Sequence, residues 1–179
     1  MGNESLKLLL DTHVWVWAAE DAKRLGRRTR SFLQNVGCER SVCAVSALEI
    51  ARLVWSGDMV LQIPLHEWVE KSLADLRADS VPVTHEIAIE AYHLPEPFHR
   101  DPADRQIVAC ARLHELTVVT ADERILRWKH VKTLDARKWE RERRASEGRA
   151  GTALVAIVPF RYSAWLALAH PFRHTRLLS

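Results

Sequence analysis

The sequence predicts an α/β fold with a mainly parallel sheet of about four or five strands. Two observations support this expectation. Short apolar runs, such as residues 6–10 and 116–120, show little alternation with polar residues, which is typical of strands buried on both faces of a parallel sheet. Between these runs apolar side chains recur at helical spacing, so that predicted strands and helices alternate along the chain.

The individual elements follow from the same patterns. Strands are expected at residues 6–10, 41–45, 80–84, 116–120 and 131–134. Helices are expected at about residues 14–20, 26–36, 46–56, 65–77, 85–92, 101–115 and 122–128. The helix at 101–115 has a clear start signal, because Asp101 is a favourable N-cap residue and Pro102 suits the first helical position.

Length and charge indicate one domain with a C-terminal extension. We expect the domain to cover residues 1–145 and a poorly ordered extension to cover residues 146–179. Residues 1–134 contain 17 Lys and Arg against 19 Asp and Glu, whereas residues 135–179 contain 9 against 4. The basic end can attract nucleic-acid phosphates without sequence preference, or it can simply keep the extension solvated.

Composition also predicts a cytoplasmic protein that does not enter a membrane. The three cysteines lack the close paired spacing of a metal site and are expected to be buried thiols in a reducing compartment. The sequence does not open with a charged and apolar leader. The apolar stretch at 152–160 is broken by Pro159 and falls short of the roughly 20 apolar residues that a membrane-spanning helix needs.

Four carboxylates fall where open parallel sheets bind their ligands, beyond the carboxyl ends of the strands. Asp11 directly follows the first predicted strand, and Asp122 comes two residues after the fourth. Glu49 lies in the first turn of the helix predicted after the second strand. Asp104 lies in the first turn of the helix that begins at Asp101, and it joins the others if that helix packs beside the same edge.

Each acid also has a purely structural explanation. Ser46 and Glu49 have the spacing of a capping box, and the helix dipole favours Asp104 in a first turn. Asp11 could cap the helix that follows it, and Asp122 could begin a turn. Four carboxylates at one edge would nevertheless raise one another's pKa values unless a cation were bound. Because Mg²⁺ prefers oxygen ligands, the group predicts metal-assisted hydrolysis of a phosphodiester.

Four segments of the chain resemble PIN domains in their order and spacing. They lie at residues 8–15, 46–50, 101–109 and 119–125, and they contain all four acids. The sequence is most similar to the VapC-type toxins of type II toxin–antitoxin systems, over roughly residues 6–139. Each segment alone is a weak signal, whereas four segments in the right order make a strong one.

This resemblance implies a Rossmann-like, three-layer α/β/α fold. It implies an endoribonuclease toxin that depends on Mg²⁺ or Mn²⁺, cleaves RNA, forms a homodimer and is inhibited by a cognate antitoxin. By position, the family's catalytic and metal-binding acids match Asp11, Glu49, Asp104 and Asp122. The polar positions that line the pocket match Thr12 and Thr120.

Several neighbouring residues allow more than one interpretation. Asp101 is an extra carboxylate that we assign to helix capping rather than to metal binding. Arg105 could contact an RNA phosphate, although an arginine in a first helical turn is more often solvated. His93 and His99 lack the spacing of a metal site.

Two other functions remain open at this point. A phosphatase of the haloacid-dehalogenase type also uses a carboxylate after its first strand, but it needs a second aspartate two residues later, where this chain has His13. Alternatively, the protein is a non-catalytic binding module whose acids hold a structural cation or cap helices.

Overall fold

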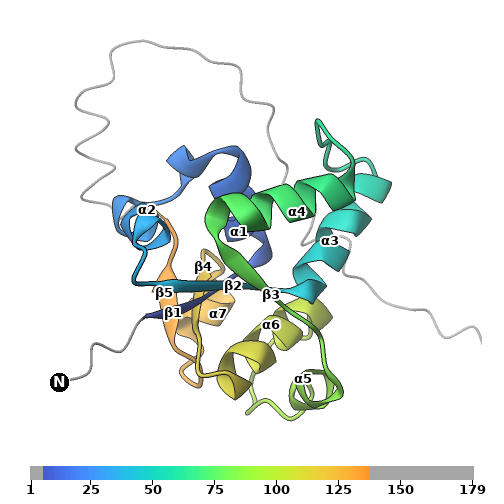
Figure 1. Cartoon of the computed structure of the whole chain (residues 1–179). Coiled ribbons are helices and arrows are strands. Elements are labelled where there is room, and N and C mark those ends of the chain that lie inside the picture. The colour runs from blue at the N-terminus through green and yellow to red at the C-terminus, as the bar shows by residue number, and fades with distance from the viewer. Residues whose placement is uncertain (1–5, 138–179) are drawn as a thin grey trace, which may run out of the picture.

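A five-stranded, all-parallel sheet forms the centre of the molecule, in the order β3-β2-β1-β4-β5 (Figure 1). The computed structural model describes residues 6–137, so the predicted extension at 146–179 lies outside the described residues. The strands are β1 (Lys7–Leu10), β2 (Glu39–Cys43), β3 (Ala78–Val81), β4 (Thr117–Thr120) and β5 (Thr133–Asp135). The helices are α1 (Thr12–Glu20), the short 3₁₀ helix η1 (Ala22–Arg24), α2 (Arg27–Gln34), α3 (Ala44–Trp55), α4 (Leu65–Leu76), α5 (His85–Glu90), α6 (Pro102–Leu113) and α7 (Glu123–Arg127).

Helices cover both faces of the sheet, which gives the predicted three layers. Helices α1, α2 and α4 lie over one face, and α5, α6 and α7 lie over the other (Figure 1). Successive residues of β1 point to opposite layers. Leu8 and Leu10 belong to the core cluster that contains Trp15 of α1. Leu9 belongs to the cluster that contains Ile107 of α6. An unbroken apolar run is therefore required in β1, because both faces of the strand are buried.

The second and third strands begin two residues earlier than predicted. Leu10 at the end of β1 pairs with Val42, and the chain turns into α3 directly after Cys43. β3 ends at Val81 because the next residue, Pro82, has no N–H for the sheet. Since α3 starts at Ala44 with Cys43 as its N-cap, the capping box expected from Ser46 and Glu49 is wrong.

Helix α3 connects the two helical layers at the carboxyl end of the sheet. It contacts α1 on one side and α6 on the other. Val45 in its first turn belongs to the core cluster of α6, whereas Ile50 belongs to that of α1. This placement brings Glu49 of α3 to the edge where β1 and β4 end.

The composition led to expectations about the state of the cysteines and about membrane-spanning helices. Cys38, Cys43 and Cys110 are free and buried, as predicted. No helix within residues 6–137 is both long enough and apolar enough to cross a membrane.

Candidate active site

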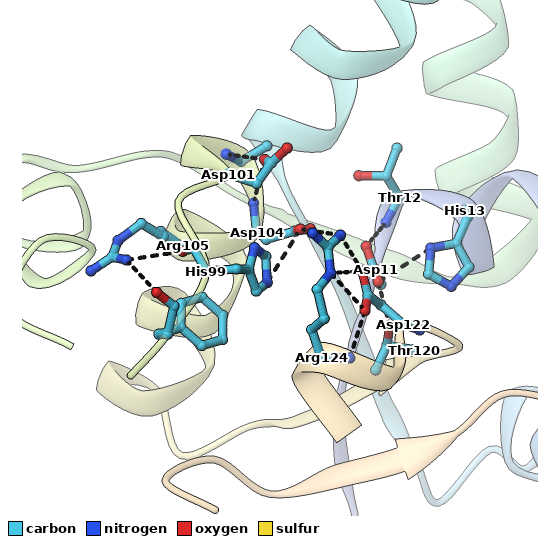
Figure 2. Close-up of polar contacts among 12 residues, drawn as sticks. Asp11, Thr12, His13, His99, Asp101, Asp104, Arg105, Thr120, Asp122 and Arg124 are labelled. Atoms are coloured by element: carbon cyan, nitrogen blue, oxygen red, sulfur yellow. Dashed lines mark hydrogen bonds and ion pairs between the residues drawn. The ribbon is translucent and has the colours of Figure 1, made fainter. Parts of the chain in front are cut away.

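Asp11 is held by three donors at the point where β1 meets α1 (Figure 2). Its Oδ1 accepts a hydrogen bond from the backbone N–H of Thr12 (2.7 Å) as it caps the helix. Its Oδ2 accepts one from the hydroxyl of Thr120 at the end of β4 (2.5 Å). His13 Nδ1 lies 3.2 Å from the same oxygen, and its Nε2 accepts a hydrogen bond from the N–H of Ala121. Two neighbouring strands therefore fix the orientation of this buried carboxylate.

Glu49 is oriented from the opposite side of the pocket by Thr12. The Thr12 hydroxyl donates to Glu49 Oε2 (2.5 Å), which links α1 to α3. Ser46 Oγ lies 2.9 Å from the Thr12 oxygen, where the serine hydroxyl can donate to it. Both Ser46 and Glu49 are buried. Ser46 therefore supports the Thr12–Glu49 pair and does not cap α3.

Asp104 enters the same region from the first turn of α6. Asp101 caps this helix and accepts hydrogen bonds from the N–H groups of Ala103 and Asp104, which confirms its predicted capping role. Asp104 is 5% exposed, and its Oδ2 is shielded from solvent without a hydrogen-bond partner. The nearest cationic or donor groups to this oxygen are His99 Nε2 at 3.5 Å and Arg124 Nη2 at 3.8 Å. Asp104 thus carries a buried acceptor that the protein itself does not satisfy.

Asp122 lies at the same edge, but its charge is matched by Arg124. The guanidinium reaches Asp122 Oδ2 through Nη2 (2.7 Å), and Nε lies 3.2 Å from both carboxylate oxygens. Burial alone would raise the pKa of Asp122, but the hydrogen bonds and charge of Arg124 outweigh it and hold this pKa below its ordinary value. The backbone N–H of Asp122 also donates to Thr120 Oγ1 (3.0 Å), which connects Asp122 to Asp11.

A pocket opens over three of the four predicted acids. Its empty space is about 590 Å³, part of it open to solvent, and Asp122 lies outside its lining. Acidic and apolar side chains both line it, and the lining comprises Asp11, Thr12, His13, Val16, Trp17, Arg24, Glu49, Leu53, Met59 and Asp104. The guanidinium of Arg24 stacks over the Trp17 ring, 4.4 Å from its centre. The pocket therefore combines carboxylates with an aromatic wall.

Burial and mutual repulsion disfavour the charged forms of two of these acids. Burial raises the pKa of Glu49 to about 7; the hydrogen bond from Thr12 opposes this rise and the charges of Asp11 and Asp101 add to it. Burial also raises the pKa of Asp104 well above its ordinary value, and the charge of Asp11 is the next largest cause. Burial is thus the main cause that disfavours the charged forms of these two acids, and the charges of neighbouring carboxylates add to it.

The residues present fit a hard divalent cation such as Mg²⁺ or Mn²⁺. Carboxylate oxygens are the ligands that such ions prefer, and a bound cation would relieve the repulsion that contributes to the raised pKa values of Glu49 and Asp104. Within the described part of the chain, no three acidic, histidine or cysteine side chains already form a metal cluster. Mg²⁺ is commonly held by one or two carboxylates, with waters and substrate phosphates completing its shell. The metal-binding role of the four acids stays a prediction.

Two arginines near the site have roles that the sequence patterns did not indicate. Arg105 is 5% exposed, and its guanidinium donates to the carbonyls of Ala91 (2.7 Å) and His99 (2.9 Å). It is neither solvated nor available to an RNA phosphate, so both interpretations of Arg105 are wrong. No sequence pattern indicates the pairing of the Arg124 side chain with Asp122, although its position two residues after this capping aspartate allows the hydrogen bond from its backbone N–H to Asp122.

Comparison with known proteins identifies the family. Residues 8–132 match the family model of the PIN domain. The chain is 33% identical over 123 residues to "Ribonuclease VapC22" of Mycobacterium tuberculosis, a match that covers 69% of this chain and 92% of that protein.

Two solved structures share the fold. One is VapBC2 from Rickettsia felis bound to a DNA fragment from its promoter, with a TM-score of 0.54, 12% identity, and coverage of 72% of this chain and 98% of that chain. The other is a toxin–antitoxin complex from Klebsiella pneumoniae, with a TM-score of 0.52, 16% identity, and coverage of 74% and 99%. The structural likeness supports the three-layer architecture, and the match to the family model spans most of the domain. The chain belongs to the PIN domain family.

Proposed function

We propose that this protein is an endoribonuclease toxin that depends on Mg²⁺ or Mn²⁺ and hydrolyses RNA phosphodiester bonds. The main support is the pocket with a floor of three buried carboxylates, Asp11, Glu49 and Asp104. The relative from Mycobacterium tuberculosis is named a ribonuclease, which supports RNA as the substrate class. Membership of the PIN family argues against a haloacid-dehalogenase phosphatase, and His13 occupies the place of the second aspartate that such an enzyme needs.

In this proposal the protein's own contribution is to hold the acids in a fixed arrangement. Thr12 and Thr120 orient Asp11 through its two oxygens, and Thr12 also orients Glu49. Asp104 supplies a further buried carboxylate in the same pocket. The pocket acids, with Asp122 at the same edge, would hold the cation. A divalent cation at this position supplies positive charge for the scissile phosphate and acidity for the activation of water.

The preset geometry explains how such a site would act on a bound RNA. Because strands and helix starts position the acids before substrate arrives, little reorganisation is needed when negative charge develops on the phosphate. Asp11, Glu49 and Asp104 are themselves buried, which strengthens their interaction with a cation. Loss of any one carboxylate should therefore reduce metal binding and cleavage together.

We also propose an antitoxin protein as inhibitor and a second copy of the chain as partner in a homodimer. Leu48 and Trp55 lie about two turns apart on α3 and are both exposed, and exposed apolar side chains on one helix face are a feature of surfaces that bind another protein. The acidic pocket would complement a basic side chain of an antitoxin, such as arginine. The cytoplasm is the proposed compartment, because RNA is the proposed substrate and the cysteines are free thiols.

The direct test is cleavage of a pool of single-stranded RNA by the purified protein with Mg²⁺, with Mn²⁺ and with EDTA. We expect products only with a divalent cation, and we expect Asp104→Asn, which keeps the side chain's size, to abolish them. Asp75→Asn on the exposed face of α4 is the matched control and should cleave like the wild type.

Two outcomes would contradict the proposal in different ways. If the protein binds Mn²⁺ and RNA but never cleaves, the interpretation as a non-catalytic binding module gains support. If cleavage persists in EDTA and in Asp104→Asn, the acidic pocket is not the site of the reaction.

A further inference from the structure

Three neighbouring polar atoms are buried without hydrogen-bond partners: Nδ1 and Nε2 of His99 and Oδ2 of Asp104. His99 Nε2 lies 3.5 Å from that oxygen (Figure 2), and the side chains of His99 and Asp104 are 14% and 8% exposed. Water therefore has little access to either group. Because a buried donor or acceptor without a partner destabilises the fold, a hydrogen bond between these two groups is favourable.

The loop that carries His99 is anchored by α6, the helix that carries Asp104. Arg105 donates from Nη1 to the carbonyls of His99 (2.9 Å) and Phe98 (3.3 Å), and from Nε to the carbonyl of Ala91 (2.7 Å). The rings of Phe98 and His99 pack with their centres 4.3 Å apart. Consecutive residues of α6 thus act on the same histidine, since Arg105 fixes its backbone and Asp104 faces its ring.

We propose that His99 is a positioning residue for Asp104. Its Nε2–H donates to Asp104 Oδ2 and so leaves the other oxygen, Oδ1, available to a divalent cation in the pocket that Asp104 lines. The proposal rests on the proposed function, because it assigns Asp104 to the metal site. Only a small movement is needed, since such hydrogen bonds are usually about 2.9 Å long and the present separation is 3.5 Å.

Arg124 does not replace His99 in this role. Its Nη2 is 3.8 Å from Asp104 Oδ2, but it is 2.7 Å from Asp122 Oδ2 and forms a pair with that acid. His99 is the donor nearer to Asp104 Oδ2, and it makes no hydrogen bond through its ring. Groups that hold the outer side of a metal-binding carboxylate typically change metal affinity by about 10–100-fold when they are removed.

Two variants separate positioning from packing. His99→Phe keeps the ring that stacks on Phe98 but removes the N–H, whereas the amide of His99→Gln can place an N–H near the position of Nε2. Binding of Mn²⁺ to the metal-free protein is titrated by the electron paramagnetic resonance signal of free Mn²⁺, and melting in EDTA monitors the fold. His114→Phe, exposed at the opposite end of α6, is the matched control.

We expect His99→Phe to weaken Mn²⁺ binding by about 10–100-fold and His99→Gln to bind almost like the wild type, with little change in melting. Unchanged affinity in His99→Phe would overturn the proposal and leave His99 a packing role. Lost affinity in both variants would also overturn it, and would indicate direct ligation by the ring. If the Phe variant fails to fold, His99→Asn, whose amide is too short to reach Asp104, takes its place with the same expectations.

The wild-type protein distinguishes failure of the proposed function from failure of the inference about His99. If the wild-type protein binds no Mn²⁺ and cleaves no RNA, the proposed function falls and the role of His99 falls with it. If the wild type binds and cleaves but the Phe variant matches it, only the inference about His99 is refuted.

Discussion

Replacing Glu49 with Gln removes a charge from the buried pocket and keeps an oxygen that can accept the hydrogen bond from Thr12. Burial raises the pKa of Glu49 from 4.5 to about 7. Between pH 4.5 and about pH 7, the folded protein keeps a proton on Glu49 that the unfolded chain has released. The stability from this proton is fully present below a pH of 4.5 and is lost as the pH rises through about 7.

The magnitude follows from the shift. A rise in pKa from 4.5 to about 7 corresponds to about 3 kcal/mol of unfolding free energy, at about 1.4 kcal/mol per unit. The Gln variant has no such proton to lose. The difference in unfolding free energy between variant and wild type should therefore grow in favour of the variant by up to about 3 kcal/mol between about pH 4.5 and pH 8. Burial and the charges of Asp11 and Asp101 raise the pKa of Asp104 in both proteins, and the variant loses only the smaller contribution of Glu49 to that rise.

Urea unfolding in EDTA, followed by circular dichroism at several values between about pH 5 and pH 8, measures this difference. Glu70→Gln, exposed on α4, is the matched control and should follow the wild type. Addition of Mn²⁺ near pH 8 should stabilise the wild type more than Glu49→Gln, because the cation replaces the missing proton. Parallel pH profiles of wild type and Glu49→Gln would refute the reasoning, since they would mean that the protein already compensates the charge of Glu49.

Three further predictions concern the surroundings of the acids. Arg105→Lys should lower the unfolding free energy by about 1–3 kcal/mol, because lysine cannot donate to the same set of buried carbonyls; a free energy of unfolding equal to that of the wild type would contradict this structural role. Thr120→Val removes the hydroxyl donor to Asp11 Oδ2 and should weaken Mn²⁺ binding by about 10–100-fold. An unchanged Mn²⁺ titration would show that this hydrogen bond does not support the site. If RNA bases stack on the pocket wall, Trp17→Ala should raise KM by about tenfold with little change in kcat, because stacking contributes about 1–3 kcal/mol per base. Ile89→Ala, exposed on α5, is its control, and equal KM values for both variants would contradict base stacking at Trp17.

The elements of the fold were predictable because most of their signals are local. The apolar run in β1 and the Asp101–Pro102 start of α6 each occupy a few adjacent residues. The ends of β2 were not predictable in this way. They depend on its pairing with β1, where Leu10 lies opposite Val42, and no local pattern contains that register.

The four acids of the candidate site differ in the same way, since two could be located from strand ends and two depend on how helices pack. Asp11 and Asp122 could be located from the ends of β1 and β4, since the carboxyl ends of parallel strands share one edge. Glu49 and Asp104 reach this edge only because α3 and α6 pack against it. Resemblance to PIN domains indicated these two acids, whereas local patterns alone explained them equally well as helix-stabilising residues.

Arg105 shows why local sequence patterns do not reveal the role of a buried charged residue near such a site. Consecutive residues of a helix point about 100° apart, so Asp104 can face the pocket while Arg105 faces the loop at 91–99. That loop has no strand partner for its carbonyl groups, and buried carbonyls need donors from elsewhere. The guanidinium of Arg105 supplies them and in doing so fixes the backbone of His99 beside Asp104. A residue whose direct contacts are purely structural thus determines the surroundings of a metal-binding candidate. Loss of Arg105 should consequently weaken Mn²⁺ binding as well as stability, although its side chain faces away from the pocket.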